Sequence, residues 1–278
     1  MSYETPGEAA GSAGGARSNI QWQLSDGIGR ITLNRPESLN AWTAEFGAEL
    51  RKAVNEDAAD PAVRAVLITG AGRGFSSGAD LKEMLEQGAA GEIPDVGEML
   101  RTRYHPIIKG IRELPKPVVA AVNGPAVGIG CSLALACDLI WAAESAVFGL
   151  AFVNIGLVPD GGSTFLVPVA AGKARALEMA LLGEPIPAAR ALEWGLINRV
   201  VPDDKLLEEA RDLARKLAQG PTRSYANSKR ALNNSFLKIM DEQLDLEADM
   251  QGEMVRTTDF IEGVSAFVEK RDARFKGN

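Results

Sequence analysis

The chain of 278 residues contains only one histidine, His105, and two cysteines, Cys131 and Cys137. The cysteines lie six positions apart in one apolar stretch. This spacing matches neither a thiol redox pair nor a zinc site, so we interpret them as reduced core thiols. A single histidine also disfavours a metal centre or a histidine relay. Carboxylates and backbone groups are therefore left to carry any chemistry, and we expect no bound metal.

The sequence also lacks long hydrophobic runs and an excess of positive charge. No run approaches the roughly 18 apolar residues of a membrane span, and no basic region followed by an apolar core opens the chain. The formal charge of -7 disfavours a general nucleic-acid or anionic-membrane surface. We therefore expect no nucleic-acid partner, no membrane partner and a cytoplasmic location. Residues 1–19 are rich in small residues and predict a disordered tail.

With 46% hydrophobic residues, the chain can bury one large core. From residue 20 onward, short β-branched runs alternate with longer segments whose apolar residues recur at spacings of three and four. This alternation predicts an α/β core over residues 20–203. The expected strands are 29–33, 64–69, 116–122 and 138–143, and the expected helices are 40–54, 97–113, 132–136 and 173–182.

The remainder of the chain, residues 204–278, has helical patterns alone. An apolar stripe runs through residues 206–217, and further helical segments cover 223–233, 239–256 and 259–270. Such a stripe faces either the core or a subunit interface, and the sequence leaves both open.

Two glycine-rich turns follow predicted strands about 50 residues apart, in FSSGADL (75–81) and GPAVGIGC (124–131). The second turn leads into an apolar helix, whose first N–H groups have no intrahelical acceptor. The sequence therefore predicts a backbone site for a developing negative charge.

These two segments, in this order and spacing, resemble those of the crotonase superfamily, which includes the enoyl-CoA hydratases and isomerases. The likeness extends to residues 31–42, 148–163 and 262–277 and covers nearly everything after residue 20. It implies an α/β spiral of ββα units with a helical C-terminal region that assembles a homotrimer or a dimer of trimers. It also implies an acyl-CoA thioester substrate. Coenzyme A then belongs to the substrate, and no separate cofactor is expected.

The resemblance assigns the two oxyanion-hole N–H groups of the family to Ala79 and to Ile129, which follows Gly128. Two fixed N–H groups that point at a thioester oxygen stabilise the enolate formed when a proton leaves carbon. Ile129 departs from the glycine usual at this position, and its β-branched side chain restricts the loop. The alternative interpretation of both loops is tight turns around a core.

Hydratase-type members use two glutamates to activate a water, and this chain has neither. The first position is Ser132 and the second is Phe152. A serine without a partner is no general base, and a phenylalanine transfers no proton. The sequence therefore disfavours ordinary two-glutamate hydration, although a water placed by Ser132 or Asp160 keeps hydration as the main alternative.

Asp160 matches the position of the catalytic carboxylate in some enoyl-CoA double-bond isomerases and in the ring-processing isomerase of phenylacetate degradation. Shifting a double bond requires one base that takes a proton from one carbon and returns it to another. Burial near Phe152 and Val158 would raise the pKa of this carboxyl. Because Pro-Asp-Gly-Gly is also a strong turn signal, a purely structural role for Asp160 is the alternative.

His105 and Asp160 also resemble, by their spacing, the histidine and the nucleophilic aspartate of chlorobenzoyl-CoA dehalogenase. The tryptophan that completes that set falls on Phe152, so a dehalogenase-like hydrolase is a further alternative. We prefer to interpret His105 as a helix-start or pocket-wall residue.

Coenzyme A contacts are implied around the first glycine loop and near the C-terminus. Cations suit the phosphates, and main-chain groups suit the adenine. We also expect Glu83 to face the acyl pocket. The residues assigned to coenzyme A or substrate contacts are Ser77, Asp80, Leu81, Lys82, Gly128, Ser132, Phe152 and Lys270.

Two other interpretations compete with an acyl-CoA enzyme. The segment GFSSG fits the G-x-S-x-G pattern with Ser76 as nucleophile, but the strand does not end at the serine, and the sole histidine follows too soon. Loss of both glutamates also fits a non-catalytic acyl-CoA binder. We favour isomerisation of an unsaturated acyl-CoA in fatty-acid or aromatic-acid degradation, with Ala79 and Ile129 holding the thioester oxygen and Asp160 moving the proton.

Overall fold

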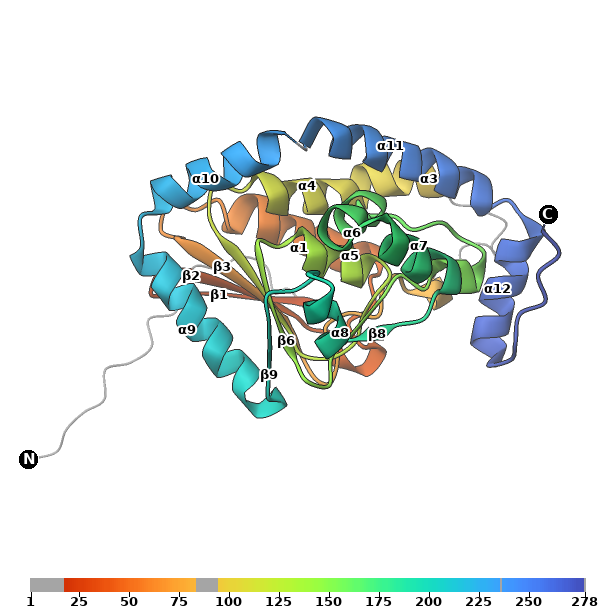
Figure 1. Cartoon of the computed structure of the whole chain (residues 1–278), viewed down its shortest axis with the longest axis horizontal. Coiled ribbons are helices and arrows are strands. Elements are labelled where there is room, and N and C mark those ends of the chain that lie inside the picture. The colour runs from red at the N-terminus through yellow and green to blue at the C-terminus, as the bar shows by residue number, and fades with distance from the viewer. Residues whose placement is uncertain (1–17, 84–94, 236, 278) are drawn as a thin grey trace, which may run out of the picture.

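A computed structural model describes residues 18–83, 95–235 and 237–277 of the chain (Figure 1). Its main sheet has six strands in the order β1-β2-β3-β4-β6-β9. β1 pairs with β2 in antiparallel orientation, and every other neighbour pair is parallel. Parallel pairing buries β3 and β4, which consist almost entirely of apolar residues. The strands are Ile20–Ser25 (β1), Ile28–Leu33 (β2), Ala65–Gly70 (β3), Val118–Val122 (β4), Leu139–Ala143 (β6) and Arg199–Val201 (β9).

A second, smaller sheet has three short strands in the order β5-β7-β8. These strands are Ala126–Val127 (β5), Val147–Gly149 (β7) and Ile186–Pro187 (β8), and they form a second layer. Two isolated parallel bridges extend this layer: Trp42 pairs with Ala79, and Ser76 pairs with Ala126 of β5. Successive units thus give a long strand to the main sheet, a short strand or bridge to the second layer, and then a helix. The predicted spiral of ββα units is confirmed.

The helices between the strands follow the predicted pattern with local differences. The region expected as one helix over 97–113 contains two α-helices and, between them, a π-helical segment, Leu100–Tyr104. This segment lies just before Pro106, which has no N–H to donate to a preceding carbonyl. The helices up to residue 193 are Ala44–Lys52 (α1), Val96–Met99 (α3), His105–Glu113 (α4), Ile129–Ala136 (α5), Ser163–Ala171 (α6), Lys173–Leu182 (α7) and Ala188–Glu193 (α8).

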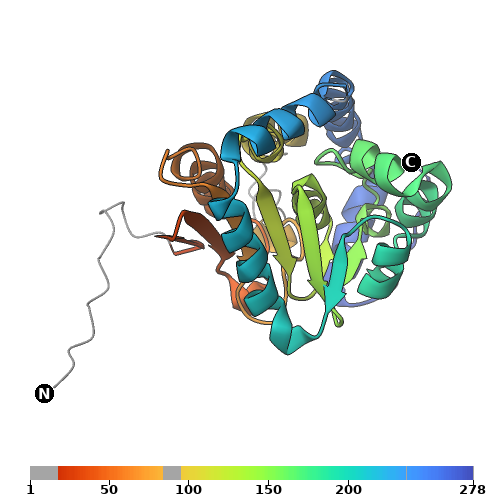
Figure 2. The ribbon, with the colours of Figure 1, turned by 60° about the vertical axis from the view of Figure 1, so that its left-hand side comes forward.

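Four helices follow β9 in the described part of the chain: Leu206–Gln219 (α9), Thr222–Asn234 (α10), Leu237–Met254 (α11) and Thr258–Glu269 (α12). α9 packs on β3 and β4, and Figure 2 shows it running across the main sheet. Leu206, Ala210 and Ala214 of its apolar stripe are buried, so these residues face the core. Leu207, in the same stripe, is 38% exposed. α10 and α11 lie along one edge of the molecule, and α12 lies at the end opposite to α9 (Figure 1).

The C-terminal helices share one core with the strands. Ala210 on α9 and Leu244 and Ala248 on α11 belong to the same buried cluster as the residues of β3 and β4. α11 also packs on α3 and α6. The helical region after residue 203 therefore forms part of the wall around the interior, and its proposed role in assembly is an additional one.

The predicted disordered tail, residues 1–19, lies outside the described residues except for its last two positions. At that end the side chain of Glu49 already accepts hydrogen bonds from the backbone and side-chain N–H groups of Asn19, both at 3.0 Å. Asn19 is therefore held by α1, although the sequence predicted it to be part of the tail. Within the described ranges, no helix combines the length and the apolar character that a membrane crossing requires.

Candidate active site

The two glycine-rich segments of the sequence lie against each other in the second layer. The N–H of Val127 donates to the carbonyl of Ser76 at 2.9 Å, next to the bridge between Ser76 and Ala126. A Cβ added at Gly78, whose φ is +96°, would lie 3.0 Å from the carbonyl oxygen of Val127. Only glycine suits both this backbone conformation and this close approach. The structure thus brings the two loops together as the sequence predicts.

The N–H of Ala79 is left free by the bridge that Ala79 forms with Trp42. The N–H of Trp42 donates to the carbonyl of Gly78 at 2.8 Å, and the N–H of Asp80 donates to the carbonyl of Trp42 at 2.9 Å. In a parallel ladder, the residue between two such bonds directs its own N–H to the opposite side. The N–H of Ala79 therefore faces away from Trp42, and Ala79 lines a cavity.

Ile129 supplies the second candidate N–H because it is the first residue of α5. The first N–H groups of a helix have no intrahelical acceptor. The preceding N–H, that of Gly128, is engaged with the carbonyl of Gly149 at 2.9 Å. Ile129 lines the same cavity as Ala79, so both predicted oxyanion donors border one space.

This space is a cavity of about 820 Å³, which is within the usual range for small-molecule sites. Most of its lining side chains are apolar. Tyr104, Asp160 and Gln251 add polar groups to the same lining. The apolar lining includes Val96, Met99, Leu100, Leu150, Phe152 and Leu157. The cavity therefore suits an acyl group that meets few polar atoms.

The carboxyl of Asp160 is buried in the cavity wall with 6% of the residue exposed. Its Oδ2 accepts a hydrogen bond from Nε2 of Gln251 at 2.8 Å. Its Oδ1 has no hydrogen-bond partner among the described residues. Burial raises the pKa of Asp160 to about 7, against the opposing effect of the Gln251 hydrogen bond and with a further increase from Glu247. Asp160 can therefore both take up and release a proton near neutral pH.

The turn that carries Asp160 packs directly on the loop that carries Ile129. Gly161 has φ +65°, and a Cβ added there would lie 2.4 Å from Cδ1 of Ile129. The hydroxyls of Ser132 and Ser163 both donate to the carbonyl of Asp160, each at 2.8 Å. These contacts fix the main chain of Asp160 relative to the helix that provides the N–H of Ile129.

Ser132, one of the predicted substrate contacts, does not reach the cavity. It is fully buried, and its hydroxyl is directed toward the carbonyl of Asp160. A substrate or a water in the cavity therefore meets Phe152, which lines it, but not Ser132. Neither of the two positions that carry acids in hydratases offers a proton-transfer group to this space.

His105 and Glu83 were possible site residues, and the structure places both outside the main cavity lining. His105 is buried, its Nε2 has no partner among the described residues, and burial together with Lys109 lowers its pKa to about 4. Successive helical residues point about 100° apart, so Tyr104 lines the cavity instead. The carboxylate of Glu83 accepts the N–H of Ala44 at 3.1 Å at the start of α1 and lines a small adjoining hollow.

Positive side chains gather where the predicted coenzyme A contacts lie. Lys82 and Lys270 both line the cavity, although they are 188 positions apart in the chain. Arg35 and Arg73, which the sequence interpretation missed, line it as well. Arg35 pairs with Asp80 at 3.0 Å, so the carboxylate of Asp80 is occupied by this ion pair. Four further predicted contacts also border the cavity: Ser77, Leu81, Gly128 and Phe152.

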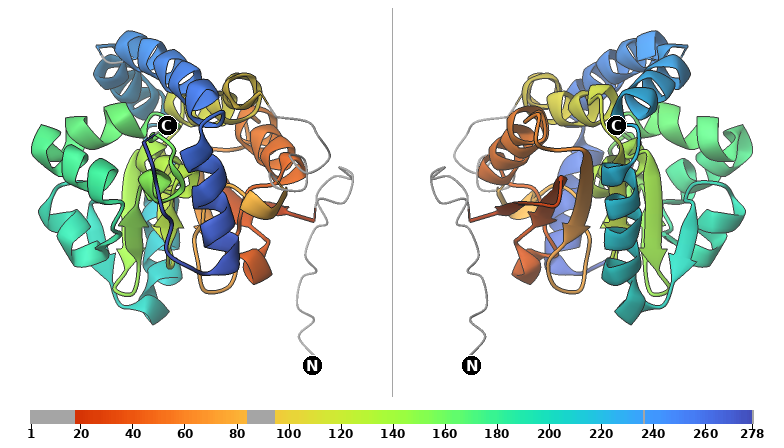
Figure 3. Two further views of the ribbon diagram at one scale, coloured as in Figure 1. Left: turned by 90° about the vertical axis from the view of Figure 1, so that its right-hand side faces the viewer. Right: turned by 90° about the vertical axis from the view of Figure 1, so that its left-hand side faces the viewer.

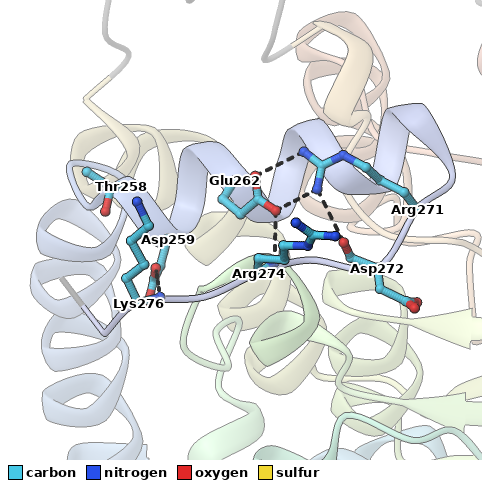
Figure 4. A pocket seen from close by; sticks show the side chains of 7 residues that line it. All are labelled: Thr258, Asp259, Glu262, Arg271, Asp272, Arg274 and Lys276. Carbon is cyan, nitrogen blue, oxygen red and sulfur yellow. Dashed lines mark hydrogen bonds and ion pairs between the residues drawn. The ribbon is translucent and has the colours of Figure 1, made fainter.

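A second hollow lies between α12 and the C-terminal tail and anchors that tail (Figure 4). The carboxylate of Glu262 accepts two bonds from Arg271, at 2.6 and 2.9 Å. The carboxylate of Asp259 accepts the N–H of Lys276 at 2.7 Å. Figure 3 shows the tail running back beside α12. These contacts hold the segment that starts at Lys270, and thereby fix where Lys270 borders the main cavity.

Tyr104 and Gln251 are cavity residues that sequence reasoning did not find. A signal for Gln251 exists, because it is a polar residue on the buried face of α11, four positions after Glu247. Tyr104 carries no comparable signal beyond its position beside His105. In the described ranges, no group of three or more histidine, cysteine, aspartate and glutamate side chains is arranged to hold a metal ion.

The family model described as enoyl-CoA hydratase/isomerase matches residues 23–278 of the chain. The chain belongs to the enoyl-CoA hydratase/isomerase family. Among its relatives in this family is the 1,2-epoxyphenylacetyl-CoA isomerase of Escherichia coli (strain K12), 45% identical over 91% of this chain and 97% of the relative. Another is a probable enoyl-CoA hydratase of Rhodobacter capsulatus, 42% identical over 93% of this chain and 98% of the relative.

Solved structures of the enoyl-CoA hydratase/isomerase family have the same fold. A crystal structure of an enoyl-CoA hydratase from Mycobacterium avium subsp. paratuberculosis K-10 superposes with a TM-score of 0.85 at 41% identity, covering 94% of this chain and all of the other. The structure of OdaA from Pseudomonas aeruginosa gives 0.81 at 36% identity, covering 90% of this chain and 98% of the other. The chain is thus an acyl-CoA enzyme of this family, whose members bear both hydratase and isomerase names.

Proposed function

We propose that this enzyme isomerises the double bond of an unsaturated acyl-CoA, with Asp160 as the single acid–base group. The observation that carries the proposal is the carboxyl of Asp160, buried in the cavity wall with one oxygen unpartnered among the described residues. The name of the Escherichia coli relative, 1,2-epoxyphenylacetyl-CoA isomerase, supports isomerisation of an acyl-CoA.

The proposed reaction begins when Oδ1 of Asp160 removes a proton from the carbon that lies between the thioester carbonyl and the double bond of a 3-enoyl-CoA. The negative charge then spreads onto the thioester oxygen as a dienolate, which the N–H groups of Ala79 and Ile129 stabilise. Asp160, now protonated, returns the proton to a different carbon of the dienolate and becomes an anion again. No atom is gained or lost, so the product is an isomer of the substrate.

The environment of Asp160 fits both halves of this cycle. A pKa of about 7 keeps a substantial fraction of the carboxyl ionised at neutral pH and makes the protonated form a useful donor. Phe152 occupies the position where hydratases carry an acid and lines the cavity. An apolar group there provides no hydrogen bond for a nucleophilic water.

For coenzyme A, we propose that Lys82 and Lys270 meet the phosphates and that backbone groups of Ser77 and Asp80 meet the adenine. The observation in support is that all four residues line the cavity. Lys82 and Lys270 come from opposite ends of the described chain, so the ligand would connect the first glycine loop with α12.

We further propose that the chain forms a homotrimer or a dimer of trimers through its C-terminal helices. Exposed apolar side chains on α10 and α11 support this: Leu232, Ile239, Leu246 and Met250. Sedimentation equilibrium measures the assembly directly, and a monomer across micromolar concentrations would contradict the proposal.

The test of the reaction compares a 3-enoyl-CoA with a 2-enoyl-CoA in water enriched in heavy oxygen. We expect the 3-enoyl-CoA to become the conjugated 2-enoyl-CoA with no label in the product. The same incubation in deuterated water should place deuterium on the chain if the proton on Asp160 exchanges with solvent. Reaction of the 2-enoyl-CoA alone, with heavy oxygen in the product, would establish hydration instead.

A further inference from the structure

Three polar side chains on the inner face of α11 all reach the turn that carries Asp160. Gln243, Glu247 and Gln251 are spaced by four residues, so they lie on one face of the helix. Glu247 and Gln251 are each only 1% exposed. Polar residues buried to this degree in a helix face normally satisfy specific partners. Their partners all belong to residues 158–164.

Glu247 and Gln243 bind the later part of this turn, at Gly162 and Thr164. The carboxylate of Glu247 accepts the N–H of Gly162 at 2.8 Å and the N–H of Thr164 at 3.1 Å. It also accepts the hydroxyl of Thr164. Nε2 of Gln243 donates to the same hydroxyl oxygen at 2.7 Å. Glu247 thus binds the first N–H groups of α6, which favour its ionised form. Burial has the larger effect and raises the pKa of Glu247 to about 7.

Gln251 binds the earlier part of the turn, at Val158 and Asp160, through both the nitrogen and the oxygen of its side-chain amide. Its Nε2 donates to Oδ2 of Asp160 at 2.8 Å, and its Oε1 accepts the N–H of Val158 at 3.3 Å. Because the amide is engaged on both sides, its orientation is fixed. Oδ2 of Asp160 is therefore held toward α11, and Oδ1 is the carboxyl oxygen that is buried without a hydrogen-bond partner among the described residues.

Among the described residues, Gln251 is the only hydrogen-bond donor to the carboxyl of Asp160. The ionisable groups that face Asp160 are Glu247 from α11 and Tyr104 from the π-helical segment. Neither is a cation. The Gln251 amide therefore supplies the favourable contact to the ionised form that no neighbouring charge provides.

We propose that Gln251 is a positioning residue that directs Oδ1 of Asp160 at the substrate carbon and favours the ionised carboxylate, while Glu247 fixes the turn beneath it. The inference rests on the proposed role of Asp160 as the base. It goes beyond that role because it assigns the orientation and the protonation of the base to a helix from the C-terminal region.

The test compares the pH dependence of kcat/KM in the wild type, Gln251→Met and Gln251→Glu. Methionine keeps the size of the side chain and removes the donor, so the acid limb should move to higher pH by on the order of one unit. Glutamate adds a second carboxylate beside Asp160 and should move the limb further in the same direction. At neutral pH, kcat should fall about 10- to 100-fold in Gln251→Met because the base is also less well oriented.

Gln243→Met is the matched control. It removes an amide from the same helix face with the same replacement, but the amide it removes contacts Thr164 and not the carboxyl of Asp160. We expect a loss of thermal stability comparable to that of Gln251→Met and an acid limb that does not move. A purely structural role of Gln251 predicts that the two variants behave alike.

A direct titration of the Asp160 carboxyl by NMR, with Asp160→Asn to assign the signal, separates this inference from the proposed function. If Asp160→Asn loses turnover while Gln251→Met keeps the wild-type titration and acid limb, the positioning role is wrong and the base stands. If Asp160→Asn keeps turnover, the proposed base is wrong. A raised carboxyl pKa in Gln251→Met would then still establish the contact but not its catalytic use.

Discussion

Two sets of polar groups in the cavity lining, called here the backbone wall and the carboxyl wall, are made of different parts of the chain. One wall consists of backbone N–H groups at Ala79 and Ile129, set by bridges between strands and by the start of a helix. The other is a single carboxyl, that of Asp160, set by side chains of α11. The backbone wall depends on chain geometry, and the carboxyl wall depends on side-chain chemistry.

This difference explains how one family can host several reactions. On the proposed mechanism, every substitution of Ala79 or Ile129 except proline keeps the N–H and therefore the thioester site. Substitutions at Phe152 or Asp160 would instead add or remove a proton-transfer group and thereby change the reaction. The four predictions that follow probe the two walls in turn, from the largest expected effect to the smallest.

Replacing the base tests the carboxyl wall most strongly. Asp160→Asn retains the shape of the side chain and removes its ability to take a proton, so kcat should fall about 10²- to 10⁴-fold. Binding of coenzyme A esters, measured by calorimetry, should stay within a few-fold of the wild type. Asn154→Asp, which changes charge at another cavity residue, serves as a control for charge alone. Retained turnover in Asp160→Asn would contradict the proposal that the Asp160 carboxyl is the acid–base group.

Removing one N–H tests the backbone wall. Ile129 is the first residue of α5, the position where a helix tolerates proline, so Ile129→Pro deletes the donor with little damage to the helix. Loss of one oxyanion donor costs about 2.7 to 4 kcal/mol, so kcat should fall roughly 10²- to 10³-fold. Ile129→Val keeps the N–H and should stay near the wild type. If both substitutions lower kcat equally, the side-chain packing of Ile129, and not its N–H, is what catalysis requires.

The carboxyl wall should also affect stability. Burial raises the pKa of Asp160 to about 7, above about 3.9 for the unfolded chain. The folded state then binds more protons than the unfolded state between these values. The stability from this group is fully present below about pH 4 and is lost as the pH rises through about 7.

Asp160→Asn removes this dependence. We expect the free energy of unfolding of Asp160→Asn, relative to that of the wild type, to increase by on the order of 3 kcal/mol between pH 4.5 and pH 8, measured by urea denaturation. Asp204→Asn, at an exposed position, should show a difference from the wild type that is the same at both pH values. A constant difference for Asp160→Asn as well would mean that the carboxyl is not penalised by burial.

The smallest expected effects concern the cavity mouth. Lys82→Ala and Lys270→Ala each remove an exposed cation that lines the cavity, and exposed charges are screened by solvent. The KM for an acyl-CoA should rise roughly two- to fivefold in each, with a steeper salt dependence in the wild type than in either variant. Lys52→Ala, an exposed lysine on α1, is the control. An unchanged KM in both variants would leave the phosphates to Arg35 and Arg73.

The sequence predicted β2, β3, β4 and β6 of the main sheet and the C-terminal helices because their apolar patterns are long or strongly periodic. It missed β1, at the edge of that sheet. It also missed β5, β7, β8 and β9, which have two or three residues each. Such strands carry too few residues for a period to show. The resemblance also implied Ser132 as a substrate contact and His105 as a possible site residue, whereas the structure directs the Ser132 hydroxyl at the carbonyl of Asp160 and leaves His105 outside the cavity lining.

What the sequence by itself determined is the family, through the two glycine-rich loops, and it singled out Asp160 as the candidate base. Glycines at fixed separations permit only a few chain paths, and a lone aspartate among apolar residues stands out as chemistry. Only the tertiary structure decided which oxygen of Asp160 is free and which helix holds the other. That choice depends on Gln251, 91 positions away, and contacts between distant segments leave no local pattern in the chain.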